Sequence, residues 1–146
     1  MIIEKIKSFD GEFAFLSNFY PSPIEKDGIK YPTVEHFFQA MKTTNLEERR
    51  AIADARTPGL AKRMGRQIHP DWEDIKVDVM KQALELKFSD LELRMRLINT
   101  GNMPLVEGNF WHDNTWGDCA CPKCVDIQGH NILGKLLMDL RERVPQ

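Results

Sequence analysis

Residues 31–42 most constrain how this chain folds, because a capping residue and a regular apolar spacing together predict a helix there. Thr33 follows a proline and is suited to be the N-cap, and Glu35 falls in the first turn. At about 100° per residue, four side chains gather on one apolar face. These are Val34, Phe37, Phe38 and Met41.

A second, polar stripe runs beside that apolar face and consists of Glu35, Gln39 and Lys42. Glu35 and Lys42 are two turns apart, roughly 10 Å along a helix axis. A carboxylate and an amine on one rigid element could therefore reach the same small molecule. The alternative is an ordinary solvated face, and periodicity alone favours that alternative.

Length and composition indicate one soluble domain over residues 1–146, with 42% apolar and 29% charged residues. A formal charge of −2 argues against a broad nucleic-acid-binding surface and leaves room for a local basic pocket. No apolar run is long enough for a membrane helix, and the N-terminal residues are charged too early for a signal peptide. Three cysteines do not make a disulfide framework, so a cytoplasmic protein is predicted.

The remaining pattern predicts an α+β fold: a mainly helical single domain with a short β-hairpin or small sheet. Asp27-Gly28 marks the turn of a hairpin over residues 24–31. Helices are expected over residues 46–55, 58–66, 71–88, 91–98 and 131–143. Short strands are expected at the start of residues 12–19 and at 105–107, the latter opening a long irregular segment that ends at His130.

Arg63 and Arg66 lie one turn apart, and paired guanidinium groups can bind a phosphate bidentately. The alternative is a solvated helix end, where cations are common. Further along, Trp111 and Trp116 offer flat surfaces for stacking on a base, and Asp118 could orient a ribose hydroxyl or a water. Both tryptophans could instead belong to the core.

Cys119, Cys121 and Cys124 are spaced compactly enough to be metal ligands, and His112 or His130 could complete a tetrahedral set. The Cys-x-Cys-x-x-Cys spacing lacks the second Cys-x-x-Cys pair that marks a zinc module. The sequence is therefore interpreted as having no metal site and no cofactor.

Several segments, in order and over residues 10–143, together resemble the NADAR family, also described as YbiA-like. The matching stretches are residues 15–19 (FLSNF), 31–42 (YPTVEHFFQAMK), 61–66 (AKRMGR), 71–72 (DW), Met80, 83–84 (AL), 87–88 (KF), 116–118 (WGD) and 131–138 (NILGKLLM). This chain differs from the family pattern at residues 119–130, a cysteine-containing insertion where some relatives have a shorter Gly-rich loop.

The resemblance implies a small, largely helical α+β domain that acts as an N-glycosidase. Its expected substrates are phosphoribosylamino-pyrimidine intermediates of riboflavin synthesis or, alternatively, guanine bases that carry ADP-ribose. By motif match, Glu35 and Lys42 would be the catalytic pair. The residues expected to line the pocket are Asn18, Arg63, Arg66, Trp72, Trp116 and Asp118.

The expected partner is thus a phosphorylated ribosyl small molecule or an ADP-ribosylated base, with no membrane. Nucleic acid would be a partner only if the substrate is an ADP-ribosylated base. Two further classes stay open: a module that binds ADP-ribose or a related nucleotide without turnover, and a zinc-stabilised interaction protein.

Overall fold

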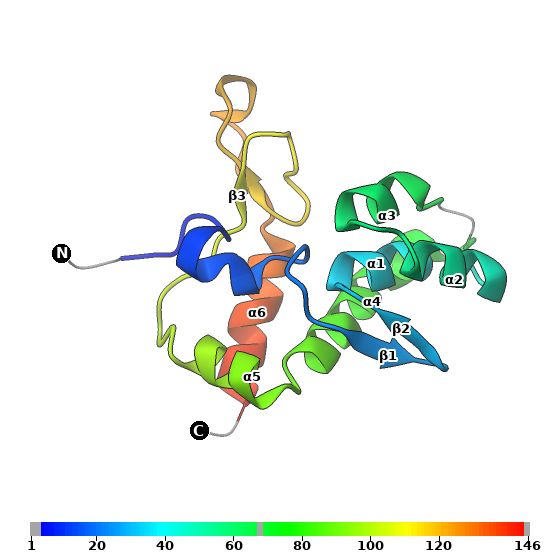
Figure 1. Cartoon of the computed structure of the whole chain (residues 1–146). Helices are drawn as coiled ribbons and strands as arrows, with labels where there is room; N and C mark the ends of the chain where they lie inside the picture. Colours follow the sequence, from blue (N-terminus) through cyan, green and yellow to red (C-terminus); the bar gives the residue numbers. More distant parts are fainter. Residues whose placement is uncertain (1–3, 67–68, 145–146) are drawn as a thin grey trace. The chain divides into compact units, whose positions relative to one another are not determined.

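The computed structural model describes residues 4–66 and 69–144, and these divide into two compact units (Figure 1). One unit is the continuous stretch Asn18–Asp90. The other combines Met1–Ser17 with Leu91–Gln146. Each unit has its own elements and buried residues, and each is described by itself.

The Asn18–Asp90 unit begins with the predicted hairpin. Strands β1 (Ile24–Lys26) and β2 (Ile29–Tyr31) pair antiparallel, with Ile24 opposite Tyr31. Asp27 and Gly28 form the turn with φ angles of 52° and 78°. Both residues are therefore left-handed, as the two-residue turn that matches strand twist requires, and an Asp-Gly pair tolerates this conformation best.

Helix α1 (Val34–Ala40) follows directly and is the centre of this unit. The Thr33 hydroxyl accepts a hydrogen bond from the His36 backbone N–H at 3.1 Å, so the predicted N-cap is confirmed. Every residue of the helix is buried, because β2 and the three following helices all pack against it. Phe37 is fully buried and meets Tyr31 edge-to-face with ring centroids 5.4 Å apart.

Those three helices are α2 (Leu46–Ala53), α3 (Pro58–Met64) and α4 (Trp72–Lys87). Asn45 caps α2, and Thr57 caps α3 with Pro58 at its first position. In α4 the sequence spacing predicts a buried face formed by Ile75, Val79, Ala83 and Leu86, and the structure buries a face rotated from it. The residues that α4 buries are Trp72, Met80, Ala83, Leu84 and Lys87.

The other unit contains helices α5 (Leu91–Ile98) and α6 (Ile132–Arg143), which begin and end within a residue of the predicted bounds. The strand predicted at the start of residues 12–19 is wrong, because Gly11–Leu16 forms a 3-10 helix, η1. Hydrogen bonds from Phe13 N to Asp10 O and from Ser17 N to Ala14 O, both 2.9 Å, hold this tight turn.

The segment 105–130 is as irregular as predicted, with short elements in other places. The expected strand at 105–107 reduces to one bridge between Leu105 and Ile6. Two-residue strands β3 (Gly108–Asn109) and β4 (Asp118–Cys119) pair in parallel, and a 3-10 helix, η2 (Pro122–Cys124), follows. The mainly helical α+β class is confirmed, and no helix in the described residues is long and apolar enough to cross a membrane.

Candidate active site

Glu35 is a buried carboxylate in the first turn of α1, with only 8% of its surface exposed. Gln39, one turn further on, donates a hydrogen bond from Nε2 to Glu35 Oε2 at 2.6 Å. The helix N-terminus places positive partial charge beside the carboxylate. The polar stripe of α1 is therefore not a solvated face, although periodicity alone favoured that interpretation.

Gln39 is a polar site residue that the sequence placed in the stripe but did not assign to the pocket. Its Nε2 is engaged by Glu35, while its buried Oε1 accepts no hydrogen bond from residues 4–66 or 69–144. Its amide also packs against Gly65 at the end of α3, where an added Cβ would collide with it. The i, i+4 spacing from Glu35 is the signal that could have identified Gln39.

Asn18 contacts Glu35 through the backbone, since its carbonyl oxygen accepts a hydrogen bond from Glu35 N at 3.0 Å. Its side chain is buried, and Nδ2 lies 3.6 Å from Met80 Sδ. Within the part of the chain that the structure describes, Asn18 Oδ1 has no hydrogen-bond partner. Buried acceptors of this kind usually have a donor. Asn18 and Gln39 both bond to Glu35, and each also carries a buried side-chain oxygen that accepts no hydrogen bond from the described residues.

Lys42 lies just beyond the end of α1 rather than inside it. The helix ends at Ala40 with Met41 as C-cap, and the Lys42 backbone N–H donates to Gln39 O at 3.3 Å in a tighter turn. The side chain is only half-exposed. Its Nζ lies 5.7 Å from the centre of the Phe38 ring and 5.9 Å from that of Trp72, within the range of cation–π contact.

Burial lowers the pKa of Lys42, because the ammonium loses water. The negative charge of Glu35 opposes this and raises the pKa, and the positive charge of Lys62 lowers it. Glu35 and Lys42 therefore act on each other electrostatically, and the amine is easier to deprotonate than an exposed lysine.

Trp72, at the start of α4, is buried and meets Phe38 with ring centroids 5.0 Å apart at 61°. The two rings form an apolar wall beside the Lys42 amine. Phe38 was predicted as part of an apolar face, and its contact with Lys42 gives it a place at the site as well. Its position four residues before Lys42 is the sequence signal for that contact.

Arg63, in the last turn of α3, and Arg66, just after it, are both exposed. Neither guanidinium has an ion pair with a carboxylate among residues 4–66 and 69–144. Helix α3 packs on α1. Gly65, which lies between the two arginines in the sequence, contacts the Gln39 side chain of α1. Both charges are therefore available to an external anion.

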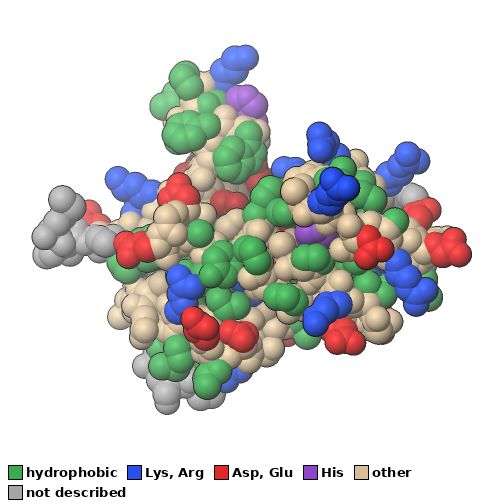
Figure 2. All heavy atoms as spheres, in the orientation of Figure 1, with side chains coloured by type: hydrophobic (Ala, Val, Ile, Leu, Met, Phe, Trp, Pro, Cys, Tyr) green, Lys and Arg blue, Asp and Glu red, His purple; other side chains and the backbone are tan. Residues whose placement is uncertain are grey.

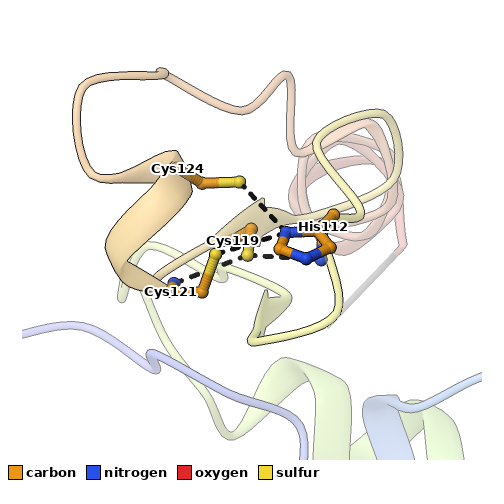
Figure 3. Close-up of side chains that lie close together, drawn as sticks. All are labelled: His112, Cys119, Cys121 and Cys124. Atoms are coloured by element: carbon orange, nitrogen blue, oxygen red, sulfur yellow. Dashed lines mark hydrogen bonds between the residues drawn. The ribbon is translucent and has the colours of Figure 1, made fainter.

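Trp116 and Asp118 belong to the other unit. Asp118, in β4, accepts a hydrogen bond from Gly129 N on Oδ1 at 2.9 Å, which ties it to the loop that follows. Trp116 is half-buried, and Trp111 is 60% exposed, so the alternative in which both are core residues does not hold. The same segment brings His112 together with Cys119, Cys121 and Cys124 (Figure 3).

His36 is a buried titratable residue within α1 that the predicted site does not include. Its Nε2 lies 3.0 Å from the Ala55 carbonyl oxygen, which can only accept, so Nε2 carries the proton. Its Nδ1 lies 2.7 Å from Thr33 Oγ1. With both nitrogens engaged, His36 holds α1 to the end of α2 and has a structural role.

A buried carboxylate and a partly desolvated amine in one small α+β unit are features that enzyme sites commonly show. The NADAR domain matches residues 6–145 of this chain. The chain therefore belongs to the NADAR family, as the resemblance predicted.

Named relatives agree with this assignment. The N-glycosidase YbiA of Escherichia coli (strain K12) is 39% identical over 142 residues, which cover 94% of this chain and 85% of YbiA. A riboflavin biosynthesis protein of Vibrio vulnificus (strain YJ016) is 33% identical over 142 residues, covering 94% of this chain and 37% of that protein. The NMR structure of E. coli YbiA superimposes with a TM-score of 0.80 at 37% identity, covering 98% of this chain and 86% of the other.

Proposed function

We propose that this chain is an N-glycosidase that hydrolyses the C–N bond between ribose and a base-like amine in phosphoribosylamino-pyrimidine intermediates of riboflavin biosynthesis. The names of the relatives support both the reaction class and the pathway. The observation that carries the proposal is the buried Glu35 carboxylate acting electrostatically on the partly desolvated Lys42 amine. In this reading the reaction removes a reactive metabolite.

Glu35 is the proposed general base or electrostatic partner. Breaking the bond from ribose C1′ to nitrogen develops positive charge at C1′ and negative charge on the leaving amine. A buried carboxylate facing C1′ stabilises that charge strongly, because little water screens it. Water then forms a bond to C1′ and gives a proton to Glu35, while the leaving amine takes a proton from solvent as the C–N bond breaks. Glu35 then releases its proton to solvent, so one water is consumed and no net charge is left on the enzyme.

Lys42 can act in either of two ways, and its position is compatible with both. As an ammonium it donates a proton or hydrogen bond to the sugar. As a neutral amine it attacks C1′, the base leaves, and the ring opens to a Schiff base that water hydrolyses back to lysine and free sugar. The lowered pKa of Lys42 increases the share of neutral amine.

The remaining predicted residues are assigned to substrate binding. Arg63 and Arg66, exposed and without an ion pair in the described residues, suit the 5′-phosphate. Asn18 Oδ1 is a buried acceptor suited to a ribose hydroxyl. For Trp116 and Asp118 we propose stacking on the base and orientation of a hydroxyl, as the family resemblance implies.

The test is to incubate the purified chain with the phosphoribosylamino-pyrimidine, and separately with ADP-ribosylated guanine, and follow release of the base. We expect faster release from the pyrimidine substrate. Glu35→Gln should lower kcat by about 10²–10⁴-fold, the range for loss of an acid–base group. The matched control Glu47→Gln, at an exposed position on α2, should leave kcat unchanged.

Lys42→Ala and its exposed control Lys30→Ala test the second residue. Borohydride trapping of a sugar–enzyme adduct that Lys42→Ala abolishes would select the Schiff-base route. If both Glu35→Gln and Lys42→Ala cleave as fast as the parent, the proposed site is wrong. Faster release from ADP-ribosylated guanine would replace the substrate, and ADP-ribose binding without release from either substrate would make the chain a recognition module.

A further inference from the structure

The segment 108–130 buries three thiols, whereas most protein segments bury aliphatic side chains. Cys119, Cys121 and Cys124 are only 3%, 7% and 5% exposed and form a cluster of their own. Meanwhile large apolar side chains of the same segment face solvent, and Figure 2 shows apolar surface over this segment at the top of the view. They are Phe110, Trp111, Val125 and Ile127. The segment is therefore not held together by an ordinary hydrophobic core.

His112 completes the set, and its ring points at the sulfur atoms (Figure 3). Its Nδ1 lies 3.2 Å from Cys121 Sγ and 3.5 Å from Cys124 Sγ. The four possible ligand atoms all lie within 4.8 Å of one another. A tetrahedral zinc with Zn–S of about 2.3 Å and Zn–N of about 2.0 Å separates its ligands by about 3.5–3.8 Å, so the observed spacing suits one ion.

The surrounding hydrogen bonds hold two of these ligands from outside. Asn109 Oδ1 accepts from the backbone N–H groups of Trp111 and Asp113, at 3.2 and 3.1 Å, and so fixes the chain on both sides of His112. The backbone N–H groups of His112 and Cys121 point at Cys119 Sγ, at 3.3 and 3.5 Å. Donors of this kind stabilise the negative charge of a metal-bound thiolate.

We propose that His112 Nδ1 and the Sγ atoms of Cys119, Cys121 and Cys124 bind one Zn²⁺ in a structural site. A disulfide would use two of the three thiols and leave the third and the imidazole unexplained, whereas a metal uses all four groups. Four protein ligands fill a tetrahedral zinc and leave no position for substrate, so the site is structural and not catalytic. The inference does not depend on the reaction proposed above.

The site selects His112 over His130, the other histidine of this segment. Both histidines are exposed, but only His112 has a ring nitrogen among the clustered ligand atoms, and His130 is not part of that cluster. Spacing alone left this choice open and argued against zinc, because it lacks a second Cys-x-x-Cys pair. The left-handed backbone at His112, with φ of 69°, brings its ring to the thiols, and such a turn is not visible in ligand spacing.

The test is elemental analysis of the full chain, purified without a histidine tag and without added metal. We expect about one zinc per chain. Cys121→Ser and His112→Asn should each weaken zinc binding by about tenfold or more. Loss of a residue that only hydrogen-bonds to a metal ligand already lowers metal affinity by about that factor, and these variants remove a ligand itself. The control His130→Asn should retain the metal in full.

A second measurement covers the case in which a ligand variant fails to fold. The parent chain, stripped of metal and loaded with Co²⁺, should show thiolate-to-cobalt charge transfer and the intense visible bands of tetrahedral coordination. A folded parent chain that contains no zinc and gives no such spectrum would overturn the proposal. Stoichiometric iron in place of zinc, or full zinc retention in both His112→Asn and Cys121→Ser, would overturn it equally.

Discussion

Helix α1 and the segment 108–130 both carry predicted site residues, yet they are held in place by different forces. Around α1, packing of apolar side chains dominates: β2, α2, α3 and α4 enclose it and every one of its residues is buried. The segment 108–130 has two-residue strands and exposed aromatic side chains. It is fixed by side chains bonded to its backbone and by the His–Cys cluster.

This difference shows that one chain can hold the side chains of a predicted site in place in two ways. A packed helix positions Glu35 because moving it would open the core. An irregular segment positions Trp116 and Asp118 through individual polar contacts, such as the two hydrogen bonds that the N–H groups of Thr115 and Trp116 donate to Asp113 Oδ1. Packing is distributed over many atoms, whereas polar contacts are few and can be removed one at a time.

The largest expected effect is on the packed region. Phe37→Ala removes a fully buried ring, and we expect the free energy of unfolding to fall by about 3–5 kcal/mol. The matched control in the other region is Phe110→Ala, where the ring is 72% exposed and the change should stay within about 0.5 kcal/mol. Urea denaturation measures both. Equal effects of the two variants would remove the contrast between the regions.

The next effect concerns the polar scaffold of the segment. Asn109 is buried, and besides its two accepted hydrogen bonds it donates from Nδ2 to Asp113 O at 2.8 Å. Asn109→Ala leaves these backbone groups unsatisfied and should cost about 1–3 kcal/mol. Hydrogen exchange should speed up at residues 110–119 while α1 stays protected. Asn102→Ala, at an exposed turn, is the control, and a uniform rise in exchange over both regions would contradict local scaffolding.

An effect of similar size tests how closely α3 approaches α1. Gly65 has ordinary backbone angles, φ −64° and ψ 128°, so alanine is tolerated there by the backbone and only its Cβ meets the Gln39 amide. Gly65→Ala should destabilise by about 1–3 kcal/mol as an overpacking change and displace the partner of Glu35. Gly59→Ala, with ordinary contacts inside α3, should be neutral or stabilising. Thermal unfolding of Gly65→Ala and Gly59→Ala measures both changes in stability, and equal effects of the two variants would contradict close packing at Gly65.

The smallest effect is a pH dependence from Lys42. Burial lowers its folded pKa below that of the unfolded chain, although Glu35 and Glu73 raise it while Lys62 and Lys76 lower it. Between the lowered pKa and the ordinary lysine pKa, the unfolded state binds more protons, so stability from this group rises with pH. Lys42→Met should therefore be more stable than the parent near neutral pH, with the difference shrinking in alkali.

The control for this prediction is Lys30→Met, at an exposed position of β2. Denaturation midpoints at several pH values should give a flat difference for Lys30→Met. A constant difference between Lys42→Met and the parent across the alkaline range would contradict a lowered pKa.

The same two regions show what the sequence could predict. The helix starts could be predicted from local sequence, because each capping side chain accepts a hydrogen bond from a backbone N–H only three residues further on. The capping residues are Thr33, Asn45 and Thr57. The burial of Glu35 and Gln39 could not be predicted in this way, because it depends on helices that are distant in sequence. The rotated face of α4 and the 3-10 helix at Gly11–Leu16 were mispredicted for the same reason: tertiary packing chose among several local options.

The predicted site residues divide along similar lines. Periodicity placed Glu35 and Lys42 on one stripe of a helix; in the structure Lys42 lies beyond the helix end, and the charge of Glu35 still raises the pKa of Lys42. Their catalytic roles, and the binding roles of Asn18, Arg63, Arg66, Trp72, Trp116 and Asp118, stay predictions, as does a single domain spanning residues 1–146. For the cysteine cluster, ligand spacing alone could not show that His112 lies with the three thiols, because the turn at His112 is a property of the folded backbone.

The way the two units divide the chain has a consequence for the order of events during synthesis. The contacts of the Asn18–Asp90 unit connect residues of one continuous stretch, so all of its partners are present once Asp90 has left the ribosome. The other unit joins Ile6 to Leu105, and that bridge must wait for a chain about a hundred residues long to close. Helix α1 and the buried Glu35 can therefore be in place while the residues that surround Trp116 are still being added.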